Sequence, residues 1–216
     1  MTSTAAAPAI IYERLTRRFA PEGTPALDAI EARIEPGRIT GLVGPDGAGK
    51  TTLLRLTAGL LLPTSGSVRV ADLDPVADAG AVRARIGYMP QRFGLYEDLS
   101  VLENLSLYAD LRGVVGQERS DAFAHLLAFT DLAQFTARPA GKLSGGMKQK
   151  LGLACVLLGS PDVLLLDEPT ASLDIENRKR VLALIAAACN MGSAVLAVFH
   201  DETERHKVCS RDIALT

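Results

Sequence analysis

Gly44-Pro45-Asp46-Gly47-Ala48-Gly49-Lys50-Thr51 lies between an apolar run at residues 39–43 and a helical pattern at residues 52–60. The three glycines leave the backbone free to turn its N–H groups inward, and the helix that follows directs the positive end of its dipole at the same point. Backbone N–H groups at a helix N-terminus bind anions. The strand, loop and helix together therefore predict a phosphate-binding cradle.

Two side chains at the end of this loop suit a nucleotide that carries magnesium. Lys50 would contact the β- and γ-phosphates as a point charge, and the Thr51 hydroxyl would ligate the Mg²⁺ ion that bridges them. An ordinary glycine turn is the alternative, but the Lys-Thr pair at this spacing favours the nucleotide site. The residues that we expect to bind ATP here are Gly44, Pro45, Asp46, Gly47, Ala48, Gly49, Lys50, Thr51 and Thr52.

A second pair of candidate residues, Asp167 and Glu168, follows the aliphatic run at residues 163–166. The carboxyl ends of parallel strands face the ligand crevice of an α/β sheet. Asp167 suits magnesium, and Glu168 suits an attacking water, which a carboxylate can orient and deprotonate. A strand that ends in a polar turn is the alternative, and the phosphate loop in the same chain favours the catalytic interpretation.

Composition limits the possible partners and the compartment. The chain has 216 residues, 48% of them hydrophobic, and a formal net charge of −2 with basic and acidic residues interspersed. This charge distribution gives no footprint for nucleic acid. Three cysteines, Cys155, Cys189 and Cys209, lie far apart, which predicts buried thiols in a reducing compartment. Since no window reaches the roughly 20 apolar residues of a membrane span and the start lacks signal-peptide features, we expect a cytoplasmic protein.

The order of the predicted elements indicates an α/β fold with a mostly parallel sheet. Strand patterns at residues 10–15, 27–34 and 67–70 predict an N-terminal antiparallel layer, and aliphatic runs at 39–43, 85–89, 163–166, 194–199 and 212–215 predict buried strands. Helical periodicity dominates at residues 101–112, 121–129 and 145–158. We therefore expect one domain over residues 1–216, with a core at 1–87 and 161–216 and an inserted helical subdomain at 88–160.

Leu143-Ser144-Gly145-Gly146 adds a second candidate anion site, because a serine cap and paired glycines open the helix at residue 145. With this motif the chain resembles the ATP-binding subunits of ABC transporters, whose signature is the Leu-Ser-Gly-Gly element. The resemblance runs from about residue 10 to the end of the chain. It implies a P-loop ATPase in which Ser144, Gly145 and Gly146 of one subunit close over the ATP held by another, as a homodimer or a heterodimer.

The resemblance also implies roles for residues outside these three motifs. Gln91 corresponds to the Q loop, with a catalytic role and contact to magnesium, and His200 corresponds to the switch histidine on the γ-phosphate. Asp174 falls in the loop Ser172-Leu173-Asp174 that crosses the dimer, and Phe19 falls at the adenine-stacking position. In the family, a membrane-spanning subunit docks beside the Q loop, here at residues 91–98 and including Phe93, Leu95 and Tyr96. A chain of this kind is peripheral on the cytoplasmic face of the membrane.

Different parts of the chain resemble two different branches of the family. Residues 41–169 are most similar to the drug-exporter branch, whereas residues 170–216 resemble the ATP-binding proteins associated with carbon-phosphorus lyase. The predicted function is therefore ATP binding and hydrolysis that powers a multidrug-type exporter. The alternative is a soluble ATPase that serves a phosphonate-degrading enzyme complex.

Overall fold

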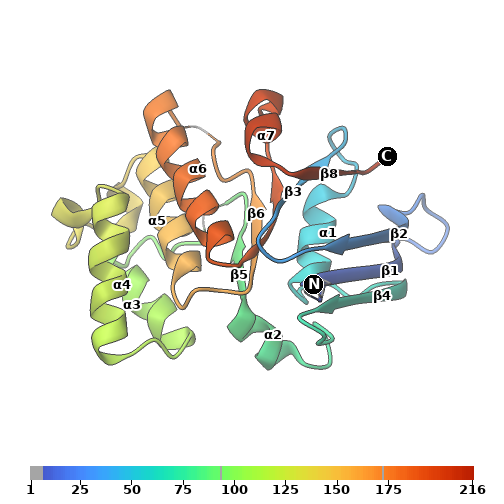
Figure 1. The fold of residues 1–216 in the computed structure, drawn as a ribbon, viewed down its shortest axis with the longest axis horizontal. Coiled ribbons are helices and arrows are strands. Elements are labelled where there is room, and N and C mark those ends of the chain that lie inside the picture. Colours follow the sequence, from blue (N-terminus) through green and yellow to red (C-terminus); the bar gives the residue numbers. More distant parts are fainter. Residues whose placement is uncertain (1–6, 93, 172) are drawn as a thin grey trace, which may run out of the picture.

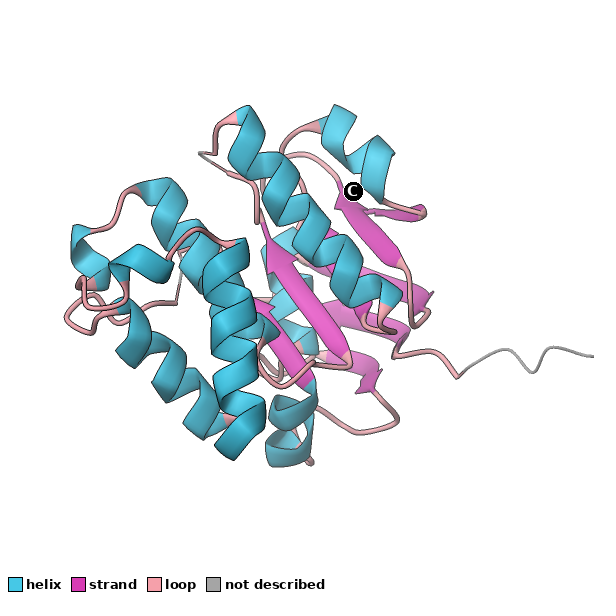
Figure 2. Ribbon diagram, turned by 60° about the vertical axis from the view of Figure 1, so that its left-hand side comes forward, coloured by secondary structure: helices cyan, strands magenta, loops and turns pink. Residues whose placement is uncertain are grey.

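A computed structural model of the protein describes residues 7–92, 94–171 and 173–216. Its centre is a parallel sheet of five strands in the order β5-β6-β7-β3-β8, with helices on both faces (Figure 1, Figure 2). The strands are β3 (Ile39–Val43), β5 (Ile86–Met89), β6 (Val163–Asp167), β7 (Ala194–Val198) and β8 (Arg211–Ala214). This architecture confirms the predicted α/β fold with a mostly parallel sheet.

The parallel sheet is buried on both faces, which is why its strands are unbroken aliphatic runs. Alternate residues of β6 point to opposite faces, so Val163 and Leu165 enter one apolar core while Leu164 and Leu166 enter another. The second core is covered by α5 (Gly145–Leu157) and α6 (Ile175–Asn190). Two packed cores hold the sheet rigid, and its carboxyl edge is therefore a fixed platform.

The first core lies between the parallel sheet and an antiparallel sheet in the order β2-β1-β4. Its strands are β1 (Ile10–Arg17), β2 (Leu27–Ile34) and β4 (Ser65–Val70), and α1 (Lys50–Thr57) lies between the two sheets (Figure 1). Tyr12 of β1 and Thr57 of α1 share a buried hydrogen bond of 2.6 Å between their hydroxyls. The antiparallel N-terminal layer that the sequence predicts is therefore confirmed.

A third apolar core lies within residues 101–158, in a group of helices at one end of the molecule (Figure 1). These are α3 (Val101–Leu111), α4 (Gly116–Phe129), the short 3-10 turns η1 (Ala133–Phe135) and η2 (Ala140–Lys142), and α5. A capping box begins α3, in which Ser100 and Glu103 bond to each other's backbone N–H groups. The predicted helices at this end of the molecule are present, and α4 begins five residues before the predicted 121.

Two short helices were not predicted, α2 (Ala79–Arg85) and α7 (Glu202–Val208). Neither helix presents a broad apolar stripe, because α2 buries one residue, Val82, and α7 buries no residue. In the part of the chain that the structure describes, no helix is long and apolar enough to cross a membrane.

Candidate functional site

The carboxyl edge of the parallel sheet gathers most of the residues that the sequence singles out. A cavity of about 280 Å³ lies there, beyond the ends of β3, β5, β6 and β7. It is lined by Asp46, Gly47, Gly49, Lys50, Thr51, Thr52, Gln91, Asp167, Glu168 and Val198. Of these residues, only Val198 was not predicted from the sequence. Segments that are more than 100 residues apart in the chain therefore meet at the crevice where α/β proteins bind their ligands.

The loop before α1 has the shape of an anion cradle. Gly44, Gly47 and Gly49 all have positive φ, at 151°, 85° and 90°. A Cβ at Gly49 would lie 2.3 Å from the carbonyl oxygen of Ala26, and one at Gly44 would lie 2.5 Å from that of Leu215. A Cβ at Gly47 would meet nothing within 4 Å. The lack of a side chain at Gly44 and Gly49 thus lets the loop pack on its neighbours, while Gly47 leaves open space for a bound group.

The Lys50 ammonium lies over this loop. Its Nζ donates hydrogen bonds to the carbonyl oxygens of Gly44 at 2.7 Å and Pro45 at 2.8 Å. The amide of Ala48 bonds to the Pro45 carbonyl as well, which closes the turn. The lysine therefore holds a fixed positive charge at the N-terminus of α1, where the helix dipole adds positive potential. A polyphosphate is the ligand that this arrangement suits best.

Thr51 and Asp167 join the loop to the end of β6. The Thr51 hydroxyl donates a hydrogen bond of 2.8 Å to Oδ2 of Asp167, a carboxylate that is only 2% exposed. Burial raises the pKa of the Asp167 carboxyl, and the bond from Thr51 acts in the opposite direction. A hydroxyl and a carboxylate beside a phosphate cradle are oxygen donors of the kind that Mg²⁺ prefers. These two side chains fit a magnesium ion that is held jointly by protein and phosphate.

Glu168 has a strained backbone at the mouth of the cavity. Its φ of 56° lies in the left-handed region that few residues other than glycine adopt. Three hydrogen bonds hold its backbone there. Its N–H donates to the Val198 carbonyl at 3.1 Å, and its carbonyl accepts from Gln149 Nε2 at 2.8 Å and from the Ala171 amide at 3.2 Å. Strain of this kind persists only where neighbouring groups impose it, and it is common at active sites.

His200 follows β7 and is exposed. Together with Glu168 it lines a second cavity, of about 360 Å³, next to the first. The structure therefore brings the predicted histidine to a cavity that shares Glu168 with the first, and none of its described lining residues belongs to the phosphate loop. Thr170, Arg178 and Glu204 complete the polar wall of this cavity, and the Thr170 hydroxyl donates to Glu204 at 2.7 Å.

The predicted signature residues form the N-terminus of α5. Ser144 caps the helix by accepting a hydrogen bond of 3.3 Å from the amide of Met147, and Gly145 and Gly146 form the first turn. They are not among the residues that line the cavity around Lys50. Within one chain, the two predicted anion-binding helix ends are therefore separate sites.

Two further predicted residues, Asp174 and Phe19, lie outside the Lys50 cavity. Asp174 caps α6 by accepting from the amide of Asn177 at 2.8 Å, a bond that lowers the pKa of its carboxyl. Phe19 is 63% exposed, and the Arg17 guanidinium lies over one face of its ring, 4.8 Å from the centroid. Ser172, the first residue of the predicted dimer-crossing loop, lies outside the described residues.

The segment after Gln91 corresponds only in part to the predicted docking surface. Tyr96 is 58% exposed, but Leu95 is half-buried against the apolar core of residues 101–158. The expectation that Leu95 is exposed is therefore wrong, because the core between α3 and α5 takes up its side chain. Phe93 lies outside the described residues. Lys148 of α5 and Glu97 of this segment form a salt bridge of 2.6 Å.

Sequence reasoning missed two polar residues that organise the site. Gln149 is 3% exposed and holds the backbone of Glu168, and Asn104 is fully buried beneath the segment that contains Tyr96. Asn104 accepts from the Tyr96 amide at 3.0 Å, and its own amide group donates to the carbonyl oxygens of Tyr96, Leu99 and Ser100. Asn104 is a polar residue on the apolar face of α3, and that signal could have found it. Gln149 stands between Lys148 and Lys150 and carries no such signal.

A parallel sheet with a glycine-rich loop between β3 and α1, Lys-Thr at the start of that helix and a carboxylate at the end of β6 defines a P-loop nucleoside triphosphatase. Comparison with known proteins narrows this further. The family model described as ABC transporter matches residues 27–171, and the chain belongs to this family.

Relatives in sequence include a multidrug transporter protein and an import protein. The chain is 53% identical over 208 residues to YbhF of Escherichia coli K12, described as a probable multidrug ABC transporter ATP-binding protein; the match covers 95% of this chain and 35% of YbhF. The chain thus spans about a third of that relative's length. It is also 40% identical to the taurine import ATP-binding protein TauB of Chromobacterium violaceum, over 91% of this chain and 74% of TauB.

Solved structures share the fold. An ATP-binding subunit of an ABC transporter superposes with a TM-score of 0.90 at 24% identity, over 96% of this chain and 85% of that one. A dimeric ATP-binding cassette, MJ0796, in a post-hydrolysis state with ADP and Pi, superposes with a TM-score of 0.86 at 26% identity, over 96% and 94% of the two chains. The expected ABC-type ATPase fold is therefore confirmed.

Proposed function

We propose that this chain is the ATP-binding and ATP-hydrolysing subunit of an ABC transporter, of the multidrug-exporter type. The observation that carries the proposal is the convergence of Lys50, Thr51, Asp167 and Glu168 on one cavity at the carboxyl edge of the sheet. The proposed functional unit is one domain over residues 1–216, with a core at 1–87 and 161–216 and a helical subdomain at 88–160.

ATP binding falls to the loop of residues 44–51 and to Phe19. The backbone N–H groups of the loop and the Lys50 ammonium receive the phosphates, for which Lys50 must leave the carbonyl oxygens of Gly44 and Pro45 that it now contacts. Thr51, Asp167 and Gln91 would hold Mg²⁺, which supplies positive charge that stabilises the transferred phosphoryl group. Phe19, exposed beside the antiparallel sheet, offers its ring face to the adenine.

Hydrolysis falls to Glu168 and His200. The Glu168 carboxylate orients a water molecule for attack on the γ-phosphate and accepts its proton, while His200, which lines the adjacent cavity, donates a hydrogen bond to the γ-phosphate oxygens. Gln149 keeps Glu168 in its strained backbone conformation. The backbone of Glu168 is therefore fixed before ATP arrives, and preorganisation of this kind limits the cost of orienting a catalytic group.

Each active site in this proposal is built from two chains. Ser144, Gly145 and Gly146 begin α5 away from the chain's own Lys50 cavity, so their N–H groups are available to the ATP of a second subunit. The dimeric cassettes of MJ0796, which superpose well on this chain, support a pairwise arrangement. The second subunit is a copy of this chain or a related ATP-binding chain, and Asp174 lies in the loop that crosses between them.

Coupling to transport requires a membrane-spanning subunit, for which we propose residues 91–98 as the docking segment. The segment is rigid at one end, because Asn104 holds the backbone of Tyr96, and is tied to the signature helix through the Glu97–Lys148 salt bridge. In this proposal the chain is peripheral, on the cytoplasmic face of the membrane, and the Glu97–Lys148 salt bridge links the docking segment to α5.

The direction of transport and the substrate type rest on the relatives. The 53% identity to YbhF extends over 95% of the chain, and thus into residues 170–216, which supports the exporter assignment over the phosphonate-degrading complex. The taurine-import relative at 40% identity represents the opposite direction. The exporter assignment therefore needs an experiment that recovers the partner.

Co-purification from cells with a variant at Tyr96 tests this function. Tyr96→Asp places a charge on the exposed ring position, and Leu111→Asp makes the same change at a residue that is 73% exposed at the end of α3. We expect Tyr96→Asp to lose a membrane-spanning partner and to keep the ATPase activity of the isolated chain, while Leu111→Asp keeps both. Recovery of carbon-phosphorus lyase components in place of a membrane protein would favour the alternative function. Recovery of an importer subunit would reverse the direction of transport.

A further inference from the structure

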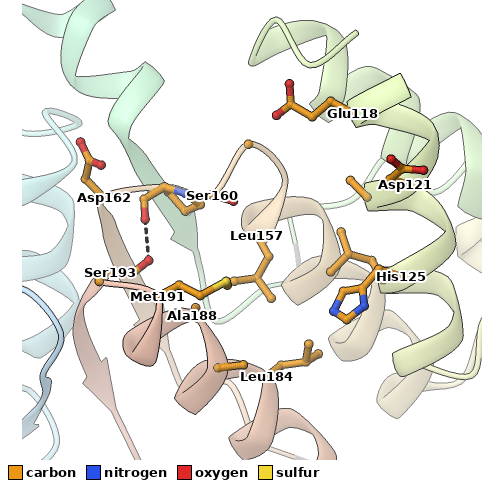
Figure 3. A pocket seen from close by; sticks show the side chains of 16 residues that line it. Glu118, Asp121, His125, Leu157, Ser160, Asp162, Leu184, Ala188, Met191 and Ser193 are labelled. Atoms are coloured by element: carbon orange, nitrogen blue, oxygen red, sulfur yellow. Dashed lines mark hydrogen bonds between the residues drawn. The ribbon is translucent and has the colours of Figure 1, made fainter. Parts of the chain in front are cut away.

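A second sizeable cavity lies away from the ATP site. It is bounded by one face of α4, the C-terminal end of α5, the last turns of α6, and the segments 159–162 and 191–193 (Figure 3). Those two segments precede β6 and β7, so the cavity is at the amino edge of the parallel sheet. The Lys50 cavity is at the carboxyl edge, and the two cavities share no lining residue.

The cavity has the volume and the apolar lining of a small-molecule site. Its volume is about 550 Å³, within the range of roughly 300 to 1,000 Å³ that is typical of ligand pockets. Leu126, Leu157 and Leu184 form apolar walls on three different helices, and the Met191 side chain points across the opening toward Leu157 (Figure 3). Met191 is 75% exposed, so water covers apolar surface that a ligand would shield.

The rim of this cavity is acidic. Glu118 and Asp121 lie on the face of α4 that borders it, one turn apart, and Asp162 lies on the opposite side (Figure 3). No lysine or arginine is among the described residues that line it. Asp162 is 3.9 Å from Arg85, and Asp121 accepts a hydrogen bond from Gln117, a neutral partner. The negative charge of Glu118 and Asp121 is therefore not balanced at the rim.

We propose that this cavity binds an organic cation with an apolar body. The leucine walls and Met191 would shield the apolar body, and Glu118 and Asp121 would face the positive charge. An anion of the same shape meets the same walls but is repelled by the rim. Charge selectivity at equal shape is therefore the property that distinguishes this site from a general hydrophobic surface.

Tetraphenylphosphonium and tetraphenylborate, which have the same shape and opposite charges, test this proposal by calorimetry on the full chain. We expect the cation to bind at least about tenfold more tightly than the anion, because attraction to two exposed carboxylates becomes repulsion. Equal affinities, or tighter binding of the anion, would overturn the proposal.

The methyl resonance of Met191, labelled with ¹³C and identified by Met191→Leu, locates the binding. Titration with the cation should shift it, while the methyl of Met89, which is fully buried, should not move. An unchanged Met191 resonance at saturation would show that the cation binds elsewhere and would overturn the assignment of the site.

Two pairs of variants separate the contributions of shape and charge. Ala187→Trp fills the cavity from an exposed position on α6 and should abolish binding, whereas Ala183→Trp, on the same helix outside the lining, should not. The double variant Glu118→Gln, Asp121→Asn should weaken cation binding about three- to tenfold and strengthen anion binding. The control double variant Asp28→Asn, Glu31→Gln on β2 also removes two negative charges, and it should leave the affinities for the cation and the anion unchanged. If the two double variants behave alike, the rim carboxylates do not select the charge and the proposal fails.

Discussion

Gln149 Nε2 donates a hydrogen bond of 2.8 Å to the carbonyl oxygen of Glu168. The glutamine lies on α5, five residues after Ser144, and the glutamate follows the last residue of β6. This bond joins the helix that carries the predicted signature to the backbone of the residue whose carboxylate we assign to hydrolysis. Because Gln149 is 3% exposed, the bond is shielded from water and holds the strained backbone of Glu168 in place.

Gln149→Leu should lower kcat for ATP hydrolysis by about 10- to 100-fold, the range in which small displacements of a catalytic group act. The affinity for ATP should stay unchanged, because Gln149 does not line the Lys50 cavity. Steady-state kinetics and calorimetry measure the two effects separately. Met147→Leu, two residues earlier on α5, serves as the control and should match the wild type. A loss of ATP affinity equal to the loss of kcat would show a general structural defect instead of a positioning role.

Glu168→Gln should reduce turnover by on the order of 10²- to 10⁴-fold and leave ATP binding intact, because the amide keeps the shape of the side chain but cannot accept a proton. ATP that is bound but not hydrolysed should hold two chains together. Gel filtration with light scattering, with and without Mg-ATP, measures this dimer. Wild-type turnover in the variant would remove Glu168 from the mechanism.

Lys50→Ala should lose ATP affinity as well as turnover, since the ammonium contacts the phosphates in the ground state. Calorimetric titration with ATP measures the affinity directly. Lys142→Ala, at a short 3-10 turn away from the cavity, controls for the loss of one positive charge. Equal ATP affinity of Lys50→Ala and the wild type would contradict the assignment of the phosphate cradle.

The three thiols should react slowly in the native protein. Cys155 and Cys189 are buried, and burial raises the pKa of both thiols; for Cys209, burial and the neighbouring Asp212 raise the pKa to about 12. At pH 8 the thiolate fraction of Cys209 is then on the order of 10³-fold below that of a free cysteine. In the reaction with 5,5′-dithiobis(2-nitrobenzoic acid), no cysteine of the native chain should react fast, and all three should react fast in the unfolded chain. One fast native thiol would contradict the observed packing.

Local sequence was enough to predict the parts of the fold that repeat a simple pattern. The aliphatic runs of β3, β6 and β7 are continuous because both faces of the sheet are buried, so they were recognised with nearly correct ends. The loop of residues 44–51 was recognised because its function depends on consecutive residues. The cavity around Lys50 confirms that these segments meet, as the carboxyl edge of a parallel sheet requires.

Interactions between distant segments were not predictable in the same way. The bond from Gln149 to Glu168 depends on how α5 packs against the end of β6, and nothing in residues 143–150 alone shows it. Leu95 was expected at the surface, although the core between α3 and α5 buries part of its side chain. The helix α7 was missed because none of its side chains is buried, so the sequence shows no apolar stripe there. Its N-cap, Asp201, is the one helix signal at this position.

Activity in a mixture of two inactive variants tests most directly whether each ATP is held between two chains. Ser144→Arg blocks the signature end of α5, and Lys50→Ala disables the cradle, so each variant alone should lack ATPase activity. A dimer of one chain of each kind retains one site with an intact Lys50 and an intact Ser144. Mixing the two variants with Mg-ATP should therefore restore activity clearly above the sum of the separate variants. A mixture that stays as inactive as its components, while both chains remain folded and dimerise, would contradict the shared site.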